Sequence, residues 1–446
     1  MTSYRADRLP TGWTVAPVYA RFSVQLGKML DEKRIVGTHL APYLRNVDVQ
    51  WGHINTADLP EMDFSEEDRE RFNLMPGDLL VCEGGEVGRT AIWDGQLDEC
   101  YYQKALHRMR PTTEHDEPRY FRYFMMMAVD AGLFALSTAS TIQHLPAEKL
   151  RVVRYPAPPC SVQKAIADYL DRETARLDAL VIAKERFLGL LAEKRRALIT
   201  RAVTRGLDPR APLRDSCSPW LGEIPAHWQV IRLKFVAGVQ GGLALGKNYG
   251  STSLVDLPYL RVANVQDGYL DLTDVATVMV PPNEAATCML MAGDVLMNEG
   301  GDADKLGRGC VWSGEISPCL HQNHVFAVRP EPGGLLPVWL NLWTSSDGAK
   351  AYLESRAKQS TNLASISSRN IKEMPMPLPP LDEQSGIVAY VDRSCCRIDE
   401  VWAATEKTID IIRERRSALI AAAVTGQLPI PPAGVGPDPA PEDRPC

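Results

Sequence analysis

Two stretches of the chain carry a hydrophobic pattern that is typical of long helices. Within residues 156–207 the apolar positions follow a 4-3 spacing, at Ile166, Leu170, Leu177, Leu180, Phe187, Leu191 and Leu198. Within residues 377–428 the same spacing appears at Ile387, Val391, Ile398, Val401, Ile412 and Leu419. A period of about 3.5 residues, uninterrupted by proline, predicts a helix with one apolar seam that packs against another helix.

The two stretches are copies of one another. Gln163 aligns with Gln384, and no gap is needed as far as Leu207 and Leu428, a constant offset of 221 residues with 18 identities in 45 positions. The copies end in "AEKRRALITRAVTRGL" and "IRERRSALIAAAVTGQL". The simplest partner for each seam is therefore the other copy. Two separate amphipathic core helices are the alternative, but they would not explain the matched ends.

The segments before the helices are also repeated. "PYLRNVDVQWGHI" matches "PYLRVANVQDGYL", "MPGDLLVCEGGEVGR" matches "MAGDVLMNEGGDADKLGR", and "YQKALHRMRP" matches "HQNHVFAVRP". Their alternating apolar residues, bounded by Gly and Pro, predict strands and turns. Between these blocks the halves diverge; 56–73 is acidic with a helical pattern, and its counterpart is not. We therefore expect one scaffold with two different surfaces.

These patterns predict an α+β chain with five parts. They are a mostly-β domain at 1–155, a long helix at 156–207, a second mostly-β domain at 208–376, a second long helix at 377–428, and a proline-rich tail at 429–446 that we expect to be disordered. The two helices should pair with one another as a coiled coil.

Candidate chemistry is sparse. The ten cysteines form no C-x-x-C, so we expect free thiols in a reducing compartment. "CEGGEVGRT" lacks the phosphate-loop frame, and its Gly pair is interpreted as a tight turn with positive φ. His321 and His324 lack acidic or thiol co-ligands and are interpreted as polar strand residues. We therefore expect no catalytic site and no metal in this chain. The N-terminus has no apolar stretch, which predicts a cytoplasmic protein without a signal peptide or a membrane span.

The helix copies carry a specific motif. A P-x-P-P…Q-x-x-I…Y-(L/V)-D-R segment opens each one, E-(K/R)-R-x-A-L-I…A-V-T closes it, and "WLGEIPAHW" opens the second domain. Over residues 9–428 the chain resembles the specificity subunit of type I restriction–modification systems. The resemblance implies two target recognition domains, each reading one half of a split double-stranded DNA sequence. It also implies that the two long helices form an antiparallel coiled coil with internal pseudo-two-fold symmetry.

The resemblance also implies the partners. Two modification subunits would supply S-adenosylmethionine binding and adenine methylation. Two restriction subunits, where a system has them, would add cleavage that depends on ATP and Mg. The specificity subunit itself would be non-catalytic and would hold no cofactor. A net charge of −7 is unusual for a chain that binds DNA alone, and the partners' charge could offset it.

Candidate DNA contacts are polar and basic residues in the divergent loops. Arg and Lys suit guanine or phosphate, whereas Asn and Gln suit adenine. The candidates are Lys28, Arg34, Arg89, Lys104 and Gln143 in the first domain, and Lys247, Asn248, Lys305, Arg308, Gln322, Asn323, Lys358 and Asn362 in the second. Arg45 and Arg261 occupy matched places in Y-L-R and are left out, because a repeated residue is as easily structural. The competing hypothesis is a coiled-coil adaptor with two β modules that does not bind DNA.

Overall fold

The structure is a computed structural model that describes residues 9–29, 37–134, 144–247, 249, 253–301, 306–359 and 364–430. The chain forms two compact units, and each takes part of both long helices. Unit 1 comprises residues 1–184 and 407–446, and unit 2 comprises residues 185–406. The sequence tail after residue 430 lies outside the described residues.

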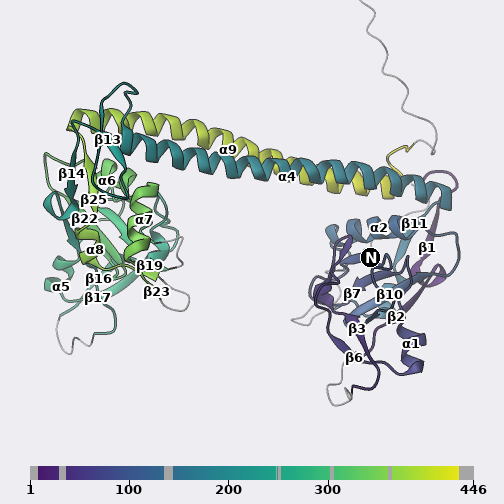
Figure 1. Ribbon diagram of the computed structural model, residues 1–446. Helices are drawn as coiled ribbons and strands as arrows, with labels where there is room; N and C mark the ends of the chain where they lie inside the picture. The colour runs from purple at the N-terminus through teal and green to yellow at the C-terminus, as the bar shows by residue number, and fades with distance from the viewer. Residues whose placement is uncertain are drawn as a thin grey trace, which may run out of the picture. The chain divides into compact units, whose positions relative to one another are not determined.

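In unit 1 a four-stranded antiparallel sheet forms the centre of a mostly-β domain, with smaller sheets around it (Figure 1). The central order is β2 (Phe22–Leu26), β10 (Leu106–Pro111), β7 (Leu79–Cys82) and β8 (Thr90–Ile92). The other strands are β6 (Glu61–Asp63), β3 (Leu40–Leu44) and β9 (Tyr101–Tyr102) in one sheet, β1 (Thr14–Pro17) with β11 (Arg154–Ala157), and β4 (Val49–Gln50) with β5 (His53–Ile54). The helices are α1 (Glu66–Phe72), α2 (Pro118–Asp130) and α3 (Ala147–Val152).

Unit 2 repeats this arrangement. Its central order is β15 (Ala237–Gln240), β22 (Val325–Pro330), β18 (Val295–Asn298) and β20 (Gly309–Val311). The other strands are β17 (Ala276–Val280), β16 (Val255–Leu260) and β21 (Leu320–His321) in one sheet, β14 (Gln229–Arg232) with β25 (Pro375–Leu378), β12 (Leu213–Asp215) with β13 (Glu223–Pro225), and β19 (Gly300–Gly301), β24 (Ala364–Ser365) and β23 (Lys358–Gln359) together. The helices are α5 (Pro282–Thr287), α6 (Pro337–Thr344), α7 (Asp347–Arg356) and α8 (Ser368–Lys372).

An ion pair between a buried aspartate and a partly exposed arginine stabilises the same place in both central sheets. The guanidinium of Arg110 donates two hydrogen bonds of 2.6 Å to the Asp78 carboxylate, and Arg329 donates bonds of 2.6 and 2.7 Å to Asp294. These aspartates come from the repeated "MPGD" and "MAGD", and their side chains are at most 1% exposed. The bonds raise the pKa of both arginines. Bidentate geometry at a buried site links two strands firmly, which explains why this part of the frame is repeated.

The long helices are α4 (Cys160–Arg205) and α9 (Leu381–Val424), and they lie side by side within each unit (Figure 1). In unit 1 the start of α4, at Ile166 and Leu170, shares a core with the end of α9, at Ile420 and Val424. In unit 2 the end of α4 shares a core with the start of α9. The pairing is therefore antiparallel in both units, and the fold is α+β as the sequence predicts.

Ion pairs between the helices obey the internal symmetry. In unit 1, Arg416 lies 2.8 Å from Asp178, and in unit 2, Arg195 lies 2.6 Å from Asp399. Arg195 and Arg416 are equivalent positions in the repeat, as are Asp178 and Asp399. The same Arg–Asp contact therefore forms in both units, with the arginine on α9 in unit 1 and on α4 in unit 2.

The predicted seam is wrong at three positions. Leu180, Phe187 and Val401 are 44, 40 and 44% exposed, whereas Thr174 and Thr405 are buried. Apolar residues stand next to one another here, as at Leu180 and Val181, so the spacing fitted two helix phases. The packing selects the phase that also buries the threonines, whose hydroxyls donate to the carbonyl four residues earlier.

One of two smaller expectations needs correction. In the acidic segment 56–73 only Glu66–Phe72 is helical, since it is preceded by strand β6 and begins after the N-cap Ser65. The positive φ predicted for the Gly pair of "CEGGEVGRT" is confirmed, since Gly85 has φ +71°. The matching Gly300 differs, because it lies in strand β19 without a positive φ. A Cβ at Gly300 would stand 2.4 Å from the Ala364 carbonyl oxygen, so close backbone approach requires glycine there.

Candidate nucleic-acid interface

One buried glutamine joins each β domain to its long helix. In unit 1 the Gln163 side chain accepts a hydrogen bond from the Glu117 N–H at 2.9 Å and donates to the carbonyls of His115 and Pro158. In unit 2 the Gln384 side chain accepts from the Leu336 N–H at 3.0 Å and donates to the carbonyls of Gly334 and Pro379. Both glutamines are at most 1% exposed. The repeated Q-x-x-I is therefore the device that fixes a domain to the framework.

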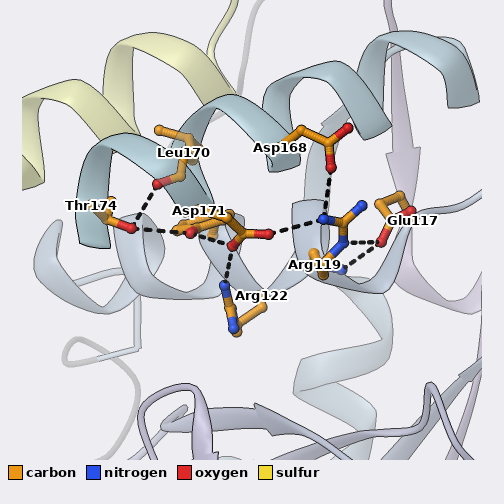
Figure 2. Close-up of polar contacts among 8 residues, drawn as sticks. Glu117, Arg119, Arg122, Asp168, Leu170, Asp171 and Thr174 are labelled. Carbon is orange, nitrogen blue, oxygen red and sulfur yellow. Dashed lines mark hydrogen bonds and ion pairs between the residues drawn. The ribbon is translucent and has the colours of Figure 1, made fainter. Parts of the chain in front are cut away.

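Unit 1 strengthens this junction with a polar clamp between α2 and α4. Figure 2 shows Arg119 pointing at Glu117, Asp168 and Asp171, with donor–acceptor distances of 2.8 to 2.9 Å. The Asp171 carboxylate also accepts from Arg122 at 2.8 Å and from the Tyr123 hydroxyl at 2.7 Å. The hydrogen bond to Glu117 is the main reason that the pKa of Arg119 is raised. Sequence reasoning missed this clamp, although Asp171 is one of the identical positions of the repeat.

The candidate Lys28 is bound within its own domain. Its ammonium group donates to the Asp68 carboxylate at 2.7 Å and to the Asp63 carbonyl at 2.5 Å, and it lies 4.8 Å from the centre of the Phe64 ring. The hydrogen bond from Lys28 lowers the pKa of Asp68, against the effect of burial. Lys28 therefore fixes α1 against β2 rather than standing free at the surface.

Lys104 lies beside Lys28 in the chain's tertiary structure, and it is exposed. Its N–H donates to the Lys28 carbonyl at 2.8 Å, in the turn between β9 and β10. In unit 2 the candidates Gln322 and Asn323 occupy the matching turn, where the Asn323 N–H donates to the Leu243 carbonyl at 3.0 Å. The structure thus places candidates from both units at one equivalent turn of the frame. We name it the matched turn, and it comprises residues 102–105 and 321–324.

Glycine makes the matched turn possible. A Cβ at Gly27 would stand 2.3 Å from the Gln103 carbonyl oxygen, and one at Gly242 would stand 2.3 Å from that of Gln322. Neither glycine has a positive φ, so the requirement is close approach. The sequence signal for this feature is a glycine shared by two otherwise divergent loops.

The remaining described candidates are dispersed. Arg89 donates to Glu86, Gln50 and Asn46, and only 11% of its side chain is exposed. Lys247 is exposed and paired with Glu284, an interaction that raises the pKa of the lysine. Arg308 is half-buried beside β20, and Lys358 is exposed at the start of β23. Arg34, Gln143, Asn248, Lys305 and Asn362 lie outside the described residues.

The two arginines of the Y-L-R repeats have structural contacts. Arg45 donates to the Asp48 carboxylate at 2.9 and 2.8 Å and thereby helps to cap a short 3-10 helix. Arg261 donates to Asp274 at 2.8 Å, at the equivalent helix.

The two histidines considered as metal ligands have other partners. The Nδ1 of His321 is 2.6 Å from the Val325 carbonyl, and burial lowers the pKa of this imidazole. The Nδ1 of His324 is 2.6 Å from the Glu299 carboxylate. In the part of the chain that the structure describes, no group of three or more His, Cys, Asp or Glu is placed to hold a metal. No helix in that same part is both long and apolar enough to cross a bilayer.

Residues 44–183 match the family model described as "Type I restriction modification DNA specificity domain". Over 442 residues the chain is 23% identical to the EcoKI type I restriction enzyme specificity subunit of Escherichia coli K12, covering 95% of this chain and 90% of that one. It is 24% identical over 202 residues to a putative MjaX specificity subunit of Methanocaldococcus jannaschii, covering 45% of this chain and 46% of that one.

Solved structures share the fold. A chain from work on complex assembly and conformational transition of the type I R-M system aligns with a TM-score of 0.72 at 18% identity, covering 94% of this chain and 99% of that one. The HsdS subunit of Thermoanaerobacter tengcongensis aligns with a TM-score of 0.55 at 17% identity, covering 96% and 99%.

Proposed function

We propose that this chain, which belongs to the specificity subunits of type I restriction–modification systems, selects an asymmetric, two-part DNA sequence for its complex. Each β domain would read one half of the target from its divergent loops. The chain would act without a catalytic site of its own and direct modification subunits to methylate adenine with S-adenosylmethionine. Where restriction subunits join, they would add cleavage driven by ATP with Mg.

The observation that carries this proposal is the duplicated junction. Gln163 and Gln384 make the same three hydrogen bonds, so two domains are attached to the framework in the same way. The surfaces that they present nevertheless differ, as Lys104 in one matched turn and Asn323 in the other illustrate. Two readers attached to the framework in equivalent ways suit two half-sites of a duplex, and their differences suit an asymmetric target.

Methylome sequencing of cells with and without this chain tests the proposal. The expected result is one adenine-methylated motif in two parts, with an unread spacer, that disappears when the chain is deleted. An adaptor that does not bind DNA would leave the methylome unchanged, and that outcome would overturn the proposal.

A domain exchange tests the independence of the two readers. Residues 1–155 are replaced by the corresponding domain of another specificity subunit, while both long helices are kept. We expect one half of the methylated motif to change and the other half to persist. Altered bases in both halves would contradict independent reading.

A further inference from the structure

Unit 2 has an open groove where its β domain meets the long helices. The groove has a volume of about 1030 Å³ and lies between α6, the end of α4 and the start of α9. Its lining includes Val338 and Leu342 from α6, Ile199 from α4, and Ala389, Asp392 and Trp402 from α9. We name it the junction groove.

The equivalent place in unit 1 is almost filled. A pocket of about 230 Å³ remains there, lined by residues that correspond through the repeat to those of the junction groove. Arg122, Tyr123 and Met126 in unit 1 correspond to Asn341, Leu342 and Ser345 in unit 2. Arg122 reaches within 3.3 Å of the Cβ position of Gly52, whereas nothing lies within 4 Å of the equivalent position at Gly268. Larger side chains on α2 therefore close the site in one unit only.

The alignment of α2 with α6 rests on shared contacts. The backbone N–H groups of Glu117 and Leu336 both donate to the junction glutamine, and a proline follows each of them. Two residues further on, the Tyr120 hydroxyl donates to the Pro156 carbonyl at 2.8 Å, and the Trp339 indole donates to the Pro377 carbonyl at 3.0 Å. The two helices thus occupy the same place in their units.

In unit 2 apolar residues stand where unit 1 has the outer part of its clamp, and we name the surface of Leu336, Val338 and Ala389 the apolar shelf. Glu117, Arg119 and Asp168 form the outer part of the clamp, and their equivalents are Leu336, Val338 and Ala389. Val338 is 43% exposed, so apolar surface faces the groove without a covering side chain from this unit. An occupant of the shelf must therefore offer an apolar side chain.

One carboxylate of the clamp persists without its donors. Asp392 is the equivalent of Asp171, which accepts from two guanidinium groups and one hydroxyl. The other charged groups of the groove pair among themselves or with a neighbour, as Arg195 with Asp399, Lys350 with Asp267, and Arg196 with Asp347. Within the described ranges no hydrogen bond or ion pair reaches the Asp392 side chain. The groove consequently carries one exposed carboxylate without a partner in the described part of the chain, beside its apolar shelf.

We infer that the junction groove receives a segment of a modification subunit that carries an arginine next to an apolar side chain. The arginine binds Asp392 and the apolar side chain covers Val338, so the partner completes in unit 2 the clamp that unit 1 makes from its own residues. A guanidinium fits because in unit 1 Arg119 and Arg122 each donate one hydrogen bond to the equivalent carboxylate. This inference rests on the proposed function, since it takes the partner from there.

Binding of the purified modification subunit to the purified full chain tests the inference. Asp392→Asn removes the charge, and the triple change Val338→Arg, Asn341→Arg and Leu342→Tyr installs the unit 1 side chains as a plug. We expect each variant to weaken binding at one site by roughly tenfold or more, as the loss of a charged hydrogen bond does. Glu400→Gln, which neutralises an exposed carboxylate of α9 outside the groove, should leave affinity within about twofold of the wild type.

The outcomes separate the two proposals. If the wild-type chain does not bind the modification subunit, the proposed function and the inference both fail. If it binds and Asp392→Asn and the plugged variant bind equally well, only the inference is overturned. Should the plugged variant not fold, judged by circular dichroism, Asp392→Asn alone decides.

A photo-crosslinking residue at position 338 adds a direct readout in the assembled complex. A crosslink to an arginine-containing peptide of the modification subunit supports the inference, whereas a crosslink to DNA, to a second copy of the chain or to no partner overturns it.

Discussion

Replacing a junction glutamine with leucine should loosen one domain from its helix. In Gln384→Leu the shape is nearly kept, but the Leu336 N–H and the carbonyls of Gly334 and Pro379 lose their side-chain partner. A buried polar group left unsatisfied costs about 1–3 kcal/mol. Gly334 is exposed, so water can replace one bond, whereas Pro379 is buried. We therefore expect the free energy of unfolding of unit 2 to fall by about 2–4 kcal/mol.

Urea denaturation followed by circular dichroism measures this loss, and thermal melting should show a midpoint lower by roughly 5–15 °C for a unit of this size. Gln163→Leu should have the same effect on unit 1, because its three hydrogen bonds are equivalent. The matched controls Lys164→Ala and Ser385→Ala change the exposed neighbours of the two glutamines and should cost less than about 0.5 kcal/mol. A glutamine variant as stable as its control would refute the view that these bonds attach the domain.

The remaining predictions concern equivalent residues, pH and salt. Asp171→Asn should destabilise unit 1 by about 1–2 kcal/mol, after allowance for its partial exposure, while Asp392→Asn should change stability by less than about 0.5 kcal/mol, because only Asp171 has donors to lose. Urea denaturation compares the two variants, and equal effects would contradict the asymmetry. Burial lowers the pKa of His107 and His321 below the unfolded value of 6.5, so the unfolded chain binds more protons than the folded chain between the folded pKa and pH 6.5. Stability should therefore be retained above pH 6.5 and lost as the pH falls below it, and a urea midpoint unchanged between pH 7.5 and 5.5 would count against this. If Lys104 contacts a phosphate, Lys104→Gln should weaken DNA binding by the assembled complex and lower the slope of log K against log salt concentration by about one unit, without altering the methylated motif. An altered motif would show instead that Lys104 reads a base.

The asymmetry between the two junctions bears on how the complex is built. In unit 1 the clamp of Arg119 and Arg122 on Asp171 sets the domain against α4 without help. In unit 2 the Gln384 bonds, apolar packing and exposed pairs such as Arg196 with Asp347 do so, no such clamp forms on Asp392 in the described chain, and the junction groove stays open. A duplication followed by divergence at six positions, five in or next to α2 and α6 and one on the long helices, is enough to produce this difference.

The sequence alone determined the architecture. Two copies of a helix, each behind a matched set of strand blocks, predicted the α+β fold and the pairing of the two copies, because hydrophobic periodicity and duplication are both local properties of the chain. The identical Gln163 and Gln384 could be found in the same way. Their role could not, because hydrogen bonds to residues about 46 to 50 positions away exist only in the folded chain.

Tertiary structure decided the rest. It chose between two seam phases at Leu180 and Val181, since neighbouring apolar residues satisfy either spacing and only the partner helix distinguishes them. It also showed that Lys28 is bound to Asp68, whereas the similar Lys104 is exposed. A lysine in a divergent loop looks the same in both cases, because composition records the charge and not the carboxylate that the fold brings to it. The open groove at Asp392 is the clearest example: the residue is identical to Asp171, and only the side chains that packing places around each one make the two sites different.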